Sequence, residues 1–229
     1  MTTTTTPRQA GAEASGCDRS TTVTRSLLGY GVLAGPVYVA VSLAQAVLRE
    51  GFDLSRHQWS LLMNGTNGWI QIANFIAAGL MCLACAVGLR RALVSSRWAP
   101  RLVATYGVSL IAAAIFRADP ALGFPPGTPT SGTAVSWHGL LHFVAGGIGF
   151  TAIAIACLLI GRRYAAEGRT RFAWFSRLTG VAFFAGFAMI ASSGGAPGAT
   201  IVFTAVVVLL WTWLSAVAAD LSRSVRAGR

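Results

Sequence analysis

The chain has 229 residues, of which 54% are hydrophobic and 11% charged, whereas an ordinary globular domain carries about 25% charged residues. Several apolar runs reach the roughly 20 residues needed to cross a bilayer, which excludes a soluble globular domain. The net charge of +11 comes from 18 arginines, no lysine and 7 acids. Because the arginines fall between the apolar runs and not on one soluble basic face, the charge argues against nucleic-acid binding.

Residues 1–25 are rich in Thr, Ser, Gly and Ala and have no apolar periodicity, which predicts a disordered cytoplasmic tail. A membrane domain is expected over residues 26–220. The last residues, 221–229, are short and basic and are predicted to form a second cytoplasmic tail.

The apolar runs predict six membrane-spanning helices and leave no room for a seventh or for a soluble domain. Pro36 in the first span is tolerated as a kink, and the third span is the shortest and ends at Arg117. The predicted spans are 27–48, 69–89, 101–117, 137–160, 173–192 and 200–219. The fold class is therefore all-α, a polytopic membrane protein built as a bundle of six transmembrane helices.

The arginines predict the orientation of this bundle. Fifteen of them fall on the side that holds both termini, and three, Arg49, Arg56 and Arg117, fall on the other side. Because cytoplasmic loops carry the excess of positive charge, this predicts that both termini are cytoplasmic, N-in and C-in. The composition, rich in Ala and Gly and without lysine, suggests a bacterium, so the expected location is the inner (plasma) membrane, with multiple spans.

The predicted topology places all three histidines on the outer side. His57 lies in the loop 49–68, and His138 and His142 begin the fourth span at positions i and i+4, which share one helix face. With Asp119, from the loop 118–136, they form a sufficient ligand set for zinc or another divalent metal. If this metal site belonged to a hydrolase, Asp53 would be the general base. The competing interpretation is structural histidines that are hydrogen-bonded by these acids or by loop carbonyls.

Other polar residues on the outer side are candidates for ligand binding. Arg117 and Asp119 flank the end of the third span and could pair with each other or with the loop 49–68. Gln71 and Asn74, at i and i+3 in the outer half of the second span, would hydrogen-bond a neighbouring helix or line an outer cavity. The candidate binding residues are Arg56, Gln71, Asn74 and Arg117.

Five separated stretches resemble an uncharacterised prokaryotic family of integral membrane proteins, domain of unknown function 998. They are GFDLSRHQWSLL (51–62), GWIQIANF (68–75), VGLRR (87–91), FRADPALGFPPGTP (116–129) and SWHGLLHFVAG (136–146). The resemblance covers about residues 27–220 and implies a membrane protein of six helices. It supplies no substrate or mechanism, since the activity of the family is unknown.

Three functions are compatible with these observations. The first is a membrane protein of unknown activity whose outer-side polar cavity, roofed by loops 49–68 and 118–136, binds a small molecule, a lipid head group or an ion. The second is a metal-dependent hydrolase of a lipid or amide. The third, a transporter, would need polar residues near the midplane or broken helices in paired halves, and the sequence has few of these signs. The expected partners are the lipid bilayer and such a ligand, with no nucleic acid, and the oligomeric state is left open.

Overall fold

The computed structural model describes residues 7–93, 96–131, 134–194 and 196–227. Within these ranges the protein is all-α, with six long helices and one short 3-10 helix. The elements are α1 (Pro7–Leu48), η1 (Trp59–Met63), α2 (Gly68–Ala92), α3 (Trp98–Ile115), α4 (Trp137–Ala166), α5 (Thr170–Ser192) and α6 (Pro197–Arg226). All six long helices are long and apolar enough to cross a membrane, which confirms the predicted number of spans.

The helices correspond to the predicted spans in number and order but begin or end at different residues. α1 begins at Pro7 and so includes part of the segment predicted to be disordered; residues 1–6 lie outside the described residues, and the division into a membrane domain and two tails stays a prediction. α3 ends at Ile115, earlier than predicted, because Phe116 has left the helical conformation with ψ of 85°.

The six helices close into a ring, since each packs on the next and α6 returns to α1. Small residues allow close approach between neighbours. A Cβ added to Gly79 of α2 would lie 2.7 Å from the carbonyl oxygen of Gly107 on α3, and one added to Gly149 of α4 would overlap Ser109 of α3. The absence of a side chain at Gly79 and Gly149 therefore allows α3 to pack closely on both α2 and α4.

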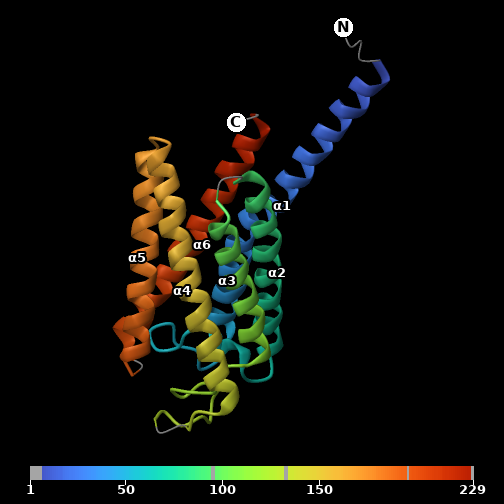
Figure 1. The fold of residues 1–229 in the computed structure, drawn as a ribbon. Coiled ribbons are helices and arrows are strands. Elements are labelled where there is room, and N and C mark those ends of the chain that lie inside the picture. Colours follow the sequence, from blue (N-terminus) through green and yellow to red (C-terminus); the bar gives the residue numbers. More distant parts are fainter. Residues whose placement is uncertain (1–6, 94–95, 132–133, 195, 228–229) are drawn as a thin grey trace.

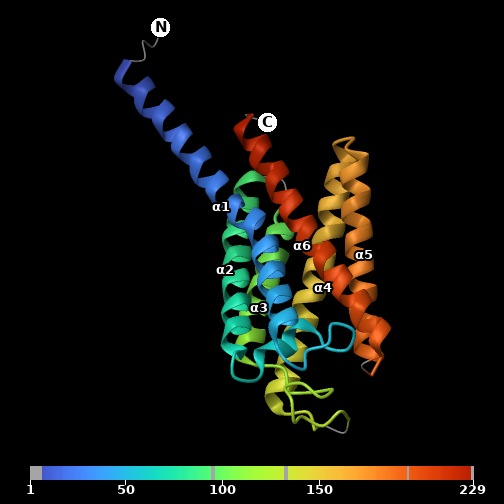
Figure 2. The ribbon, with the colours of Figure 1, turned by 180° about the vertical axis from the view of Figure 1, so that it is seen from behind.

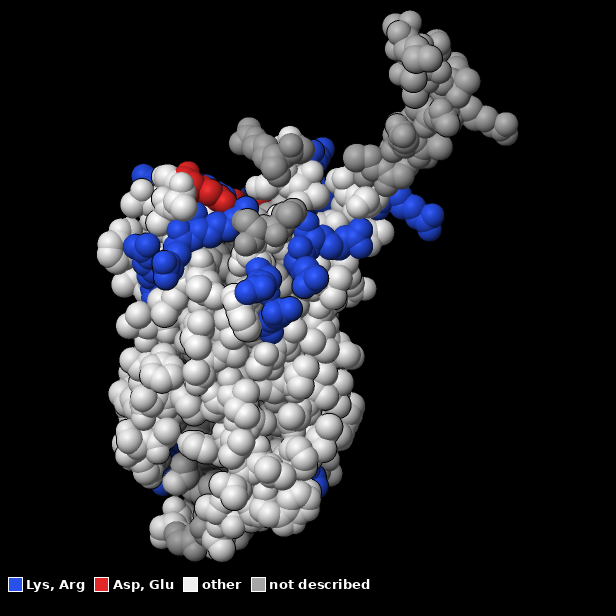
Figure 3. All heavy atoms as spheres, viewed as in Figure 1, with Lys and Arg blue, Asp and Glu red and all other residues white. Residues whose placement is uncertain are grey.

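The two ends of the ring are chemically different. Both termini lie at one end, and the long connections between α1 and α2 and between α3 and α4 lie at the other (Figures 1 and 2). Figure 3 shows arginine side chains gathered at the end that holds the termini, with few at the opposite end of the same face. The end with the long connections is called the loop end below.

Candidate functional site

His57 joins the two long loops at the loop end. It is buried, with 3% of its surface exposed. Its Nδ1 accepts a hydrogen bond from the Asp53 backbone N–H at 2.9 Å, and its Nε2 lies 3.0 Å from the Leu122 carbonyl oxygen. Because Nδ1 accepts, the proton of the neutral ring is on Nε2, which donates to Leu122. Both ring nitrogens are thus engaged, and the ring also packs on Phe124 at 5.5 Å between centroids.

A second connection between the loops is made by Arg49, which follows α1. Its guanidinium donates to the carbonyl oxygens of Leu62 and Asn64 and lies 5.0 Å from the centroid of the buried Phe124 ring. The Asn64 side-chain amide in turn donates to the Ala118 carbonyl oxygen at 3.0 Å. Nothing in the local sequence around Arg49 indicates this role, because its partners are carbonyl groups distant in the chain.

Asp119 connects the loop between α3 and α4 to the start of α4 through hydrogen bonds. Its carboxylate accepts hydrogen bonds from the Ser136 backbone N–H at 2.7 Å and from the Ser136 hydroxyl. The same hydroxyl accepts from the Gly139 N–H at 3.1 Å, so Ser136 is the N-cap of α4. A carboxylate here also interacts favourably with the positive end of the helix dipole.

The two histidines of α4 have different surroundings, although they share one face. His142 is half-buried, and its Nδ1 lies 2.9 Å from the carbonyl oxygens of both Ala113 and Phe116 at the end of α3. These carbonyls lack partners within α3, as at any helix end, and His142 satisfies them. His138 is exposed and stacks on Trp137, with 3.6 Å between ring centroids.

The four predicted metal ligands are not assembled in this structure. His57 has both ring nitrogens in hydrogen bonds, and Asp119 is bonded to Ser136. Within the described ranges, no group of three or more His, Cys, Asp or Glu side chains is placed to hold a metal ion. His57 and His142 are hydrogen-bonded, as in the competing interpretation, although their partners are backbone groups of both loops and of the end of α3. The metal site stays a prediction.

Asp53, the predicted general base, is an exposed residue of the first loop. Its Oδ1 accepts hydrogen bonds from the hydroxyl and the backbone N–H of Ser55, at 2.7 and 2.8 Å. These bonds hold the pKa of the Asp53 carboxyl below its usual value. A general base that works near neutral pH needs a pKa shifted in the opposite direction, so this geometry favours a role in shaping the loop.

Of the predicted binding residues, Gln71 and Asn74 lie together, at 3.2 Å between Gln71 Oε1 and Asn74 Nδ2, in the contact of α2 with α1. Arg56 and Arg117 are exposed, and the ion pairs found in the described part of the chain do not include an Arg117–Asp119 pair. Gln71 and Asn74 are buried and face α1, where they form a seam of hydrogen bonds. Asn74 Nδ2 donates to the Tyr38 carbonyl at 3.1 Å, and Gln71 Oε1 accepts from Gln45 at 2.7 Å.

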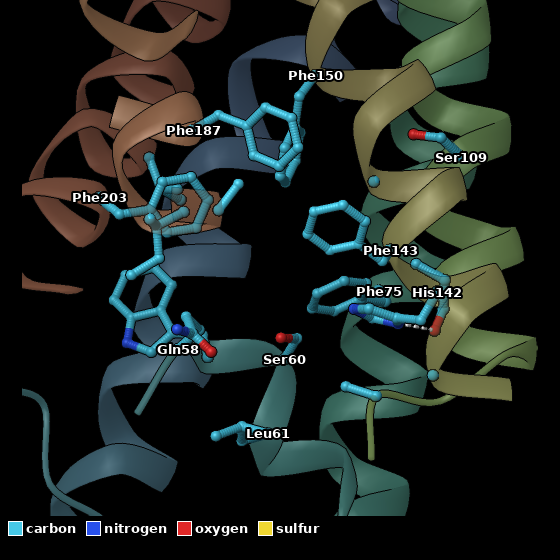
Figure 4. A pocket seen from close by; sticks show the side chains of 18 of the residues that line it. Gln58, Ser60, Leu61, Phe75, Ser109, His142, Phe143, Phe150, Phe187 and Phe203 are labelled. Atoms are coloured by element: carbon cyan, nitrogen blue, oxygen red, sulfur yellow. Dashed lines mark hydrogen bonds between the residues drawn. The ribbon is translucent and has the colours of Figure 1, made fainter. Parts of the chain in front are cut away.

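A cavity of about 490 Å³ lies inside the helix ring, toward the loop end. Most of its wall is aromatic and aliphatic, and Figure 4 shows several of the rings turned toward a common space. The aromatic lining includes Tyr38, Phe75, Tyr106, Phe143, Phe150, Phe187 and Phe203.

Four polar residues of the cavity wall lie at its loop end, and Ser109 of α3 lines it further from the loops (Figure 4). Gln58 and Ser60 come from the start of η1, His142 from α4 and Asp119 from the second loop. Sequence reasoning selected His142 and Asp119 but missed the η1 residues and the aromatic residues, because only the packing of η1 beneath the helices brings them together. Of the other predicted site residues, His57 and His138 do not line this cavity.

A shallow groove on the outer surface of α4 and α5 adjoins the cavity. Phe143, Phe187 and Ala191 line both spaces, and the rings of Phe143 and Phe187 lie 6.0 Å apart between centroids. The groove is otherwise lined mainly by apolar residues such as Val144 and Ile148, which are exposed on the outside of the ring, and also by Thr105 and Thr151. The cavity and the groove therefore meet at this aromatic pair.

These observations define a multi-span α-helical membrane protein. The chain belongs to the family described as Protein of unknown function (DUF998), whose model matches residues 32–220. This confirms the resemblance found in the sequence. No curated protein and no solved structure matches the chain.

Proposed function

We propose that this protein binds an amphiphilic small molecule from the membrane in the cavity of the helix ring. The observation that carries the proposal is a mainly apolar, aromatic-rich cavity with a group of polar side chains, Gln58, Ser60, Asp119 and His142, at its loop end. Its volume of about 490 Å³ is within the range of about 300–1,000 Å³ typical of small-molecule sites. The apolar part of the ligand would pack against Phe150, Phe187 and Phe203, with its polar group near His142.

The position of the Phe143–Phe187 pair supports entry from the bilayer. Both rings line the cavity on one side and the lipid-facing groove on the other. Rotation of either side chain would widen the passage between the two spaces without unfolding a helix. An amphiphile dissolved in the membrane could then enter sideways, so the ligand need not cross an aqueous layer.

The loop end is proposed to face away from the cytoplasm, in the inner membrane of a bacterium. The support is the gathering of arginines near the termini (Figure 3), which the positive-inside rule assigns to the cytoplasmic side. The ligand's polar group would then lie near the outer leaflet.

Native mass spectrometry of the detergent-purified protein tests the proposal, after incubation with a total lipid extract of the expression host. Thr204 lines the cavity, whereas its neighbour Ala205 is exposed on the outside of α6. We expect a bound lipid with the wild type and with Ala205→Trp, and loss of that adduct with Thr204→Trp, which fills the cavity. An adduct that persists in folded Thr204→Trp would show that the cavity is not the site.

A further inference from the structure

The polar end of the cavity also carries information about the chemical class of the ligand. We infer that the bound amphiphile ends in a hydroxyl group, as a long-chain or isoprenoid alcohol does. The inference rests on the proposed function, because it concerns the polar group of the same ligand.

The first step is the hydrogen-bonding state of His142. Its Nδ1 faces two carbonyl oxygens, those of Ala113 and Phe116. Since both are acceptors, Nδ1 carries a proton and donates to them. The apolar surroundings favour the neutral ring, which leaves a lone pair on Nε2. In Figure 4 the hydrogen-bonded side of the ring faces α3 and the rest of the ring faces the cavity, so Nε2 offers an acceptor to a ligand that can donate.

The second step is the charge of the cavity wall. Among the described residues that line the cavity there is no Arg or Lys, and the acid Asp119 is present. Arg49, the arginine built into the loop end, is bonded to the carbonyl oxygens of Leu62 and Asn64 and does not line the cavity. A phosphate or carboxylate head group would therefore meet a carboxylate and no compensating cation, which disfavours anionic lipids.

The third step distinguishes a hydroxyl group from an ammonium group. The cavity wall is mainly apolar, and the Asp119 carboxylate already accepts hydrogen bonds from the backbone N–H and the hydroxyl of Ser136. Burial of a charged ammonium group in such surroundings costs far more than burial of a neutral hydroxyl group. A hydroxyl group can donate to the free imidazole nitrogen of His142 without that cost.

Four tritiated probes with the same alkyl chain test the inference: dodecanol, dodecyl methyl ether, dodecyl phosphate and dodecylamine. Binding to the full-length protein in detergent is measured by equilibrium dialysis, and specific binding is the part that Thr204→Trp abolishes. We expect dodecanol to bind about tenfold more tightly than the ether, which corresponds to one hydrogen bond to a buried acceptor. Dodecyl phosphate and dodecylamine are expected to bind more weakly than dodecanol.

Two variants test the residues that carry the inference. His142→Phe should bring the preference for dodecanol over the ether close to one; because this is a ratio within one variant, partial loss of folded protein does not affect it. Asp119→Asn should strengthen the binding of dodecyl phosphate relative to dodecanol, since it removes the negative charge and retains an oxygen acceptor for Ser136.

The possible failures are distinguishable. If the ether, the phosphate or the amine binds as tightly as dodecanol and Thr204→Trp abolishes that binding, the hydroxyl inference is overturned and the proposed function stands. A dodecanol preference that survives in His142→Phe also overturns it. If neither the probes nor the lipid extract shows binding that depends on Thr204, the proposed function fails as well.

Discussion

At the scale of single residues, the three histidines illustrate how different roles arise from one residue type. His57 links two loops through both ring nitrogens, His142 satisfies the last carbonyls of α3, and His138 stacks on an exposed tryptophan. The i, i+4 spacing of His138 and His142 was compatible with a shared metal. In the structure the two histidines contact different groups.

The roles of His57 and His138 predict unequal costs of substitution. His57→Ala leaves the Asp53 N–H and the Leu122 carbonyl without their partner, so we expect a loss of about 1–3 kcal/mol in the free energy of unfolding. His138→Ala, the matched control, should change stability by less than about 0.5 kcal/mol, as for an ordinary surface substitution. Denaturant unfolding of the detergent-solubilised protein measures both. Equal effects would contradict the assigned roles.

Gly149 of α4 is a second residue whose role can be tested. Its added Cβ would overlap Ser109 of α3, whereas a Cβ added to Gly146 would lie 3.8 Å from the nearest atom, Cε2 of Phe150. Gly149→Ala should therefore destabilise the protein by about 1–3 kcal/mol through overpacking. Gly146→Ala is the control on the same helix and should be nearly neutral. A thermal unfolding midpoint that is unchanged in Gly149→Ala would show that α3 and α4 pack less closely than described.

At the scale of elements, the contact of α1 with α2 depends on a buried polar seam. Asn74 Nδ2 donates to the Tyr38 carbonyl, to Ser42 Oγ at 3.2 Å and to Gln71 Oε1 at 3.2 Å. In a bilayer there is little hydrophobic force between helices, so packing and hydrogen bonds of this kind hold them together. Tyr38, whose carbonyl takes part in the seam, also reaches the cavity with its ring, so the seam helps to position one of its walls.

Removal of these bonds should loosen the pair of helices. Asn74→Leu keeps a similar side-chain shape and removes the bonds, and at about 0.6 kcal/mol for each bond in a membrane we expect a loss of about 1–2 kcal/mol. Ala73→Leu is the control, because Ala73 is exposed on the outside of the ring. Unfolding of both variants in detergent measures the difference. A stability equal to that of the control would mean that the seam contributes nothing to holding α1 against α2.

A second connection between elements lies near the termini. Arg169, in the turn between α4 and α5, donates to both carboxylate oxygens of Asp220 on α6, at 2.7 and 2.6 Å, and Tyr164 donates to the same carboxylate at 2.9 Å. These bonds hold the pKa of the Arg169 guanidinium above its usual value. The cluster attaches the last helix to the α4–α5 turn and so helps to close the ring.

At the scale of the whole molecule, the two ends of the ring differ in composition and in the length of their connections. The end with the termini carries most arginines and short connections, while the loop end carries η1, the clamped loops and the polar part of the cavity. Polar groups that lie at one end of a membrane protein face one side of the membrane. The proposed orientation therefore decides which compartment the ligand's polar group faces.

Labelling of single cysteines in intact cells tests that orientation. The cysteines at 82, 85 and 157 are buried. A Cys17→Ser variant should therefore react little with the maleimide, and the single test cysteines are introduced into it. Thr130→Cys at the loop end should react with a membrane-impermeant maleimide in intact cells, whereas Ala227→Cys should react only after lysis. Both positions are exposed. The reverse pattern would place the loop end in the cytoplasm and contradict the proposed orientation.

The sequence by itself determined the all-α class, the six spanning helices and the family. These properties depend on local hydrophobicity and on short motifs, which can be read along the chain because a bilayer requires about 20 apolar residues in each span. Its candidate residues included His142 and Asp119, which do line the cavity. It could also anticipate hydrogen bonding of Gln71 and Asn74 to a neighbouring helix.

Only the tertiary structure decided which polar groups have partners. The carbonyl oxygens that bond His57 and His142 belong to Leu122, Ala113 and Phe116. Because every residue has a main-chain carbonyl group, the sequence does not indicate which of these groups will bond a given side chain. The cavity likewise arises where η1 and several helices converge, and no single segment encodes it. A sequence can therefore supply a ligand set that is sufficient in composition without showing which backbone groups bond its members, as with His57 and His142.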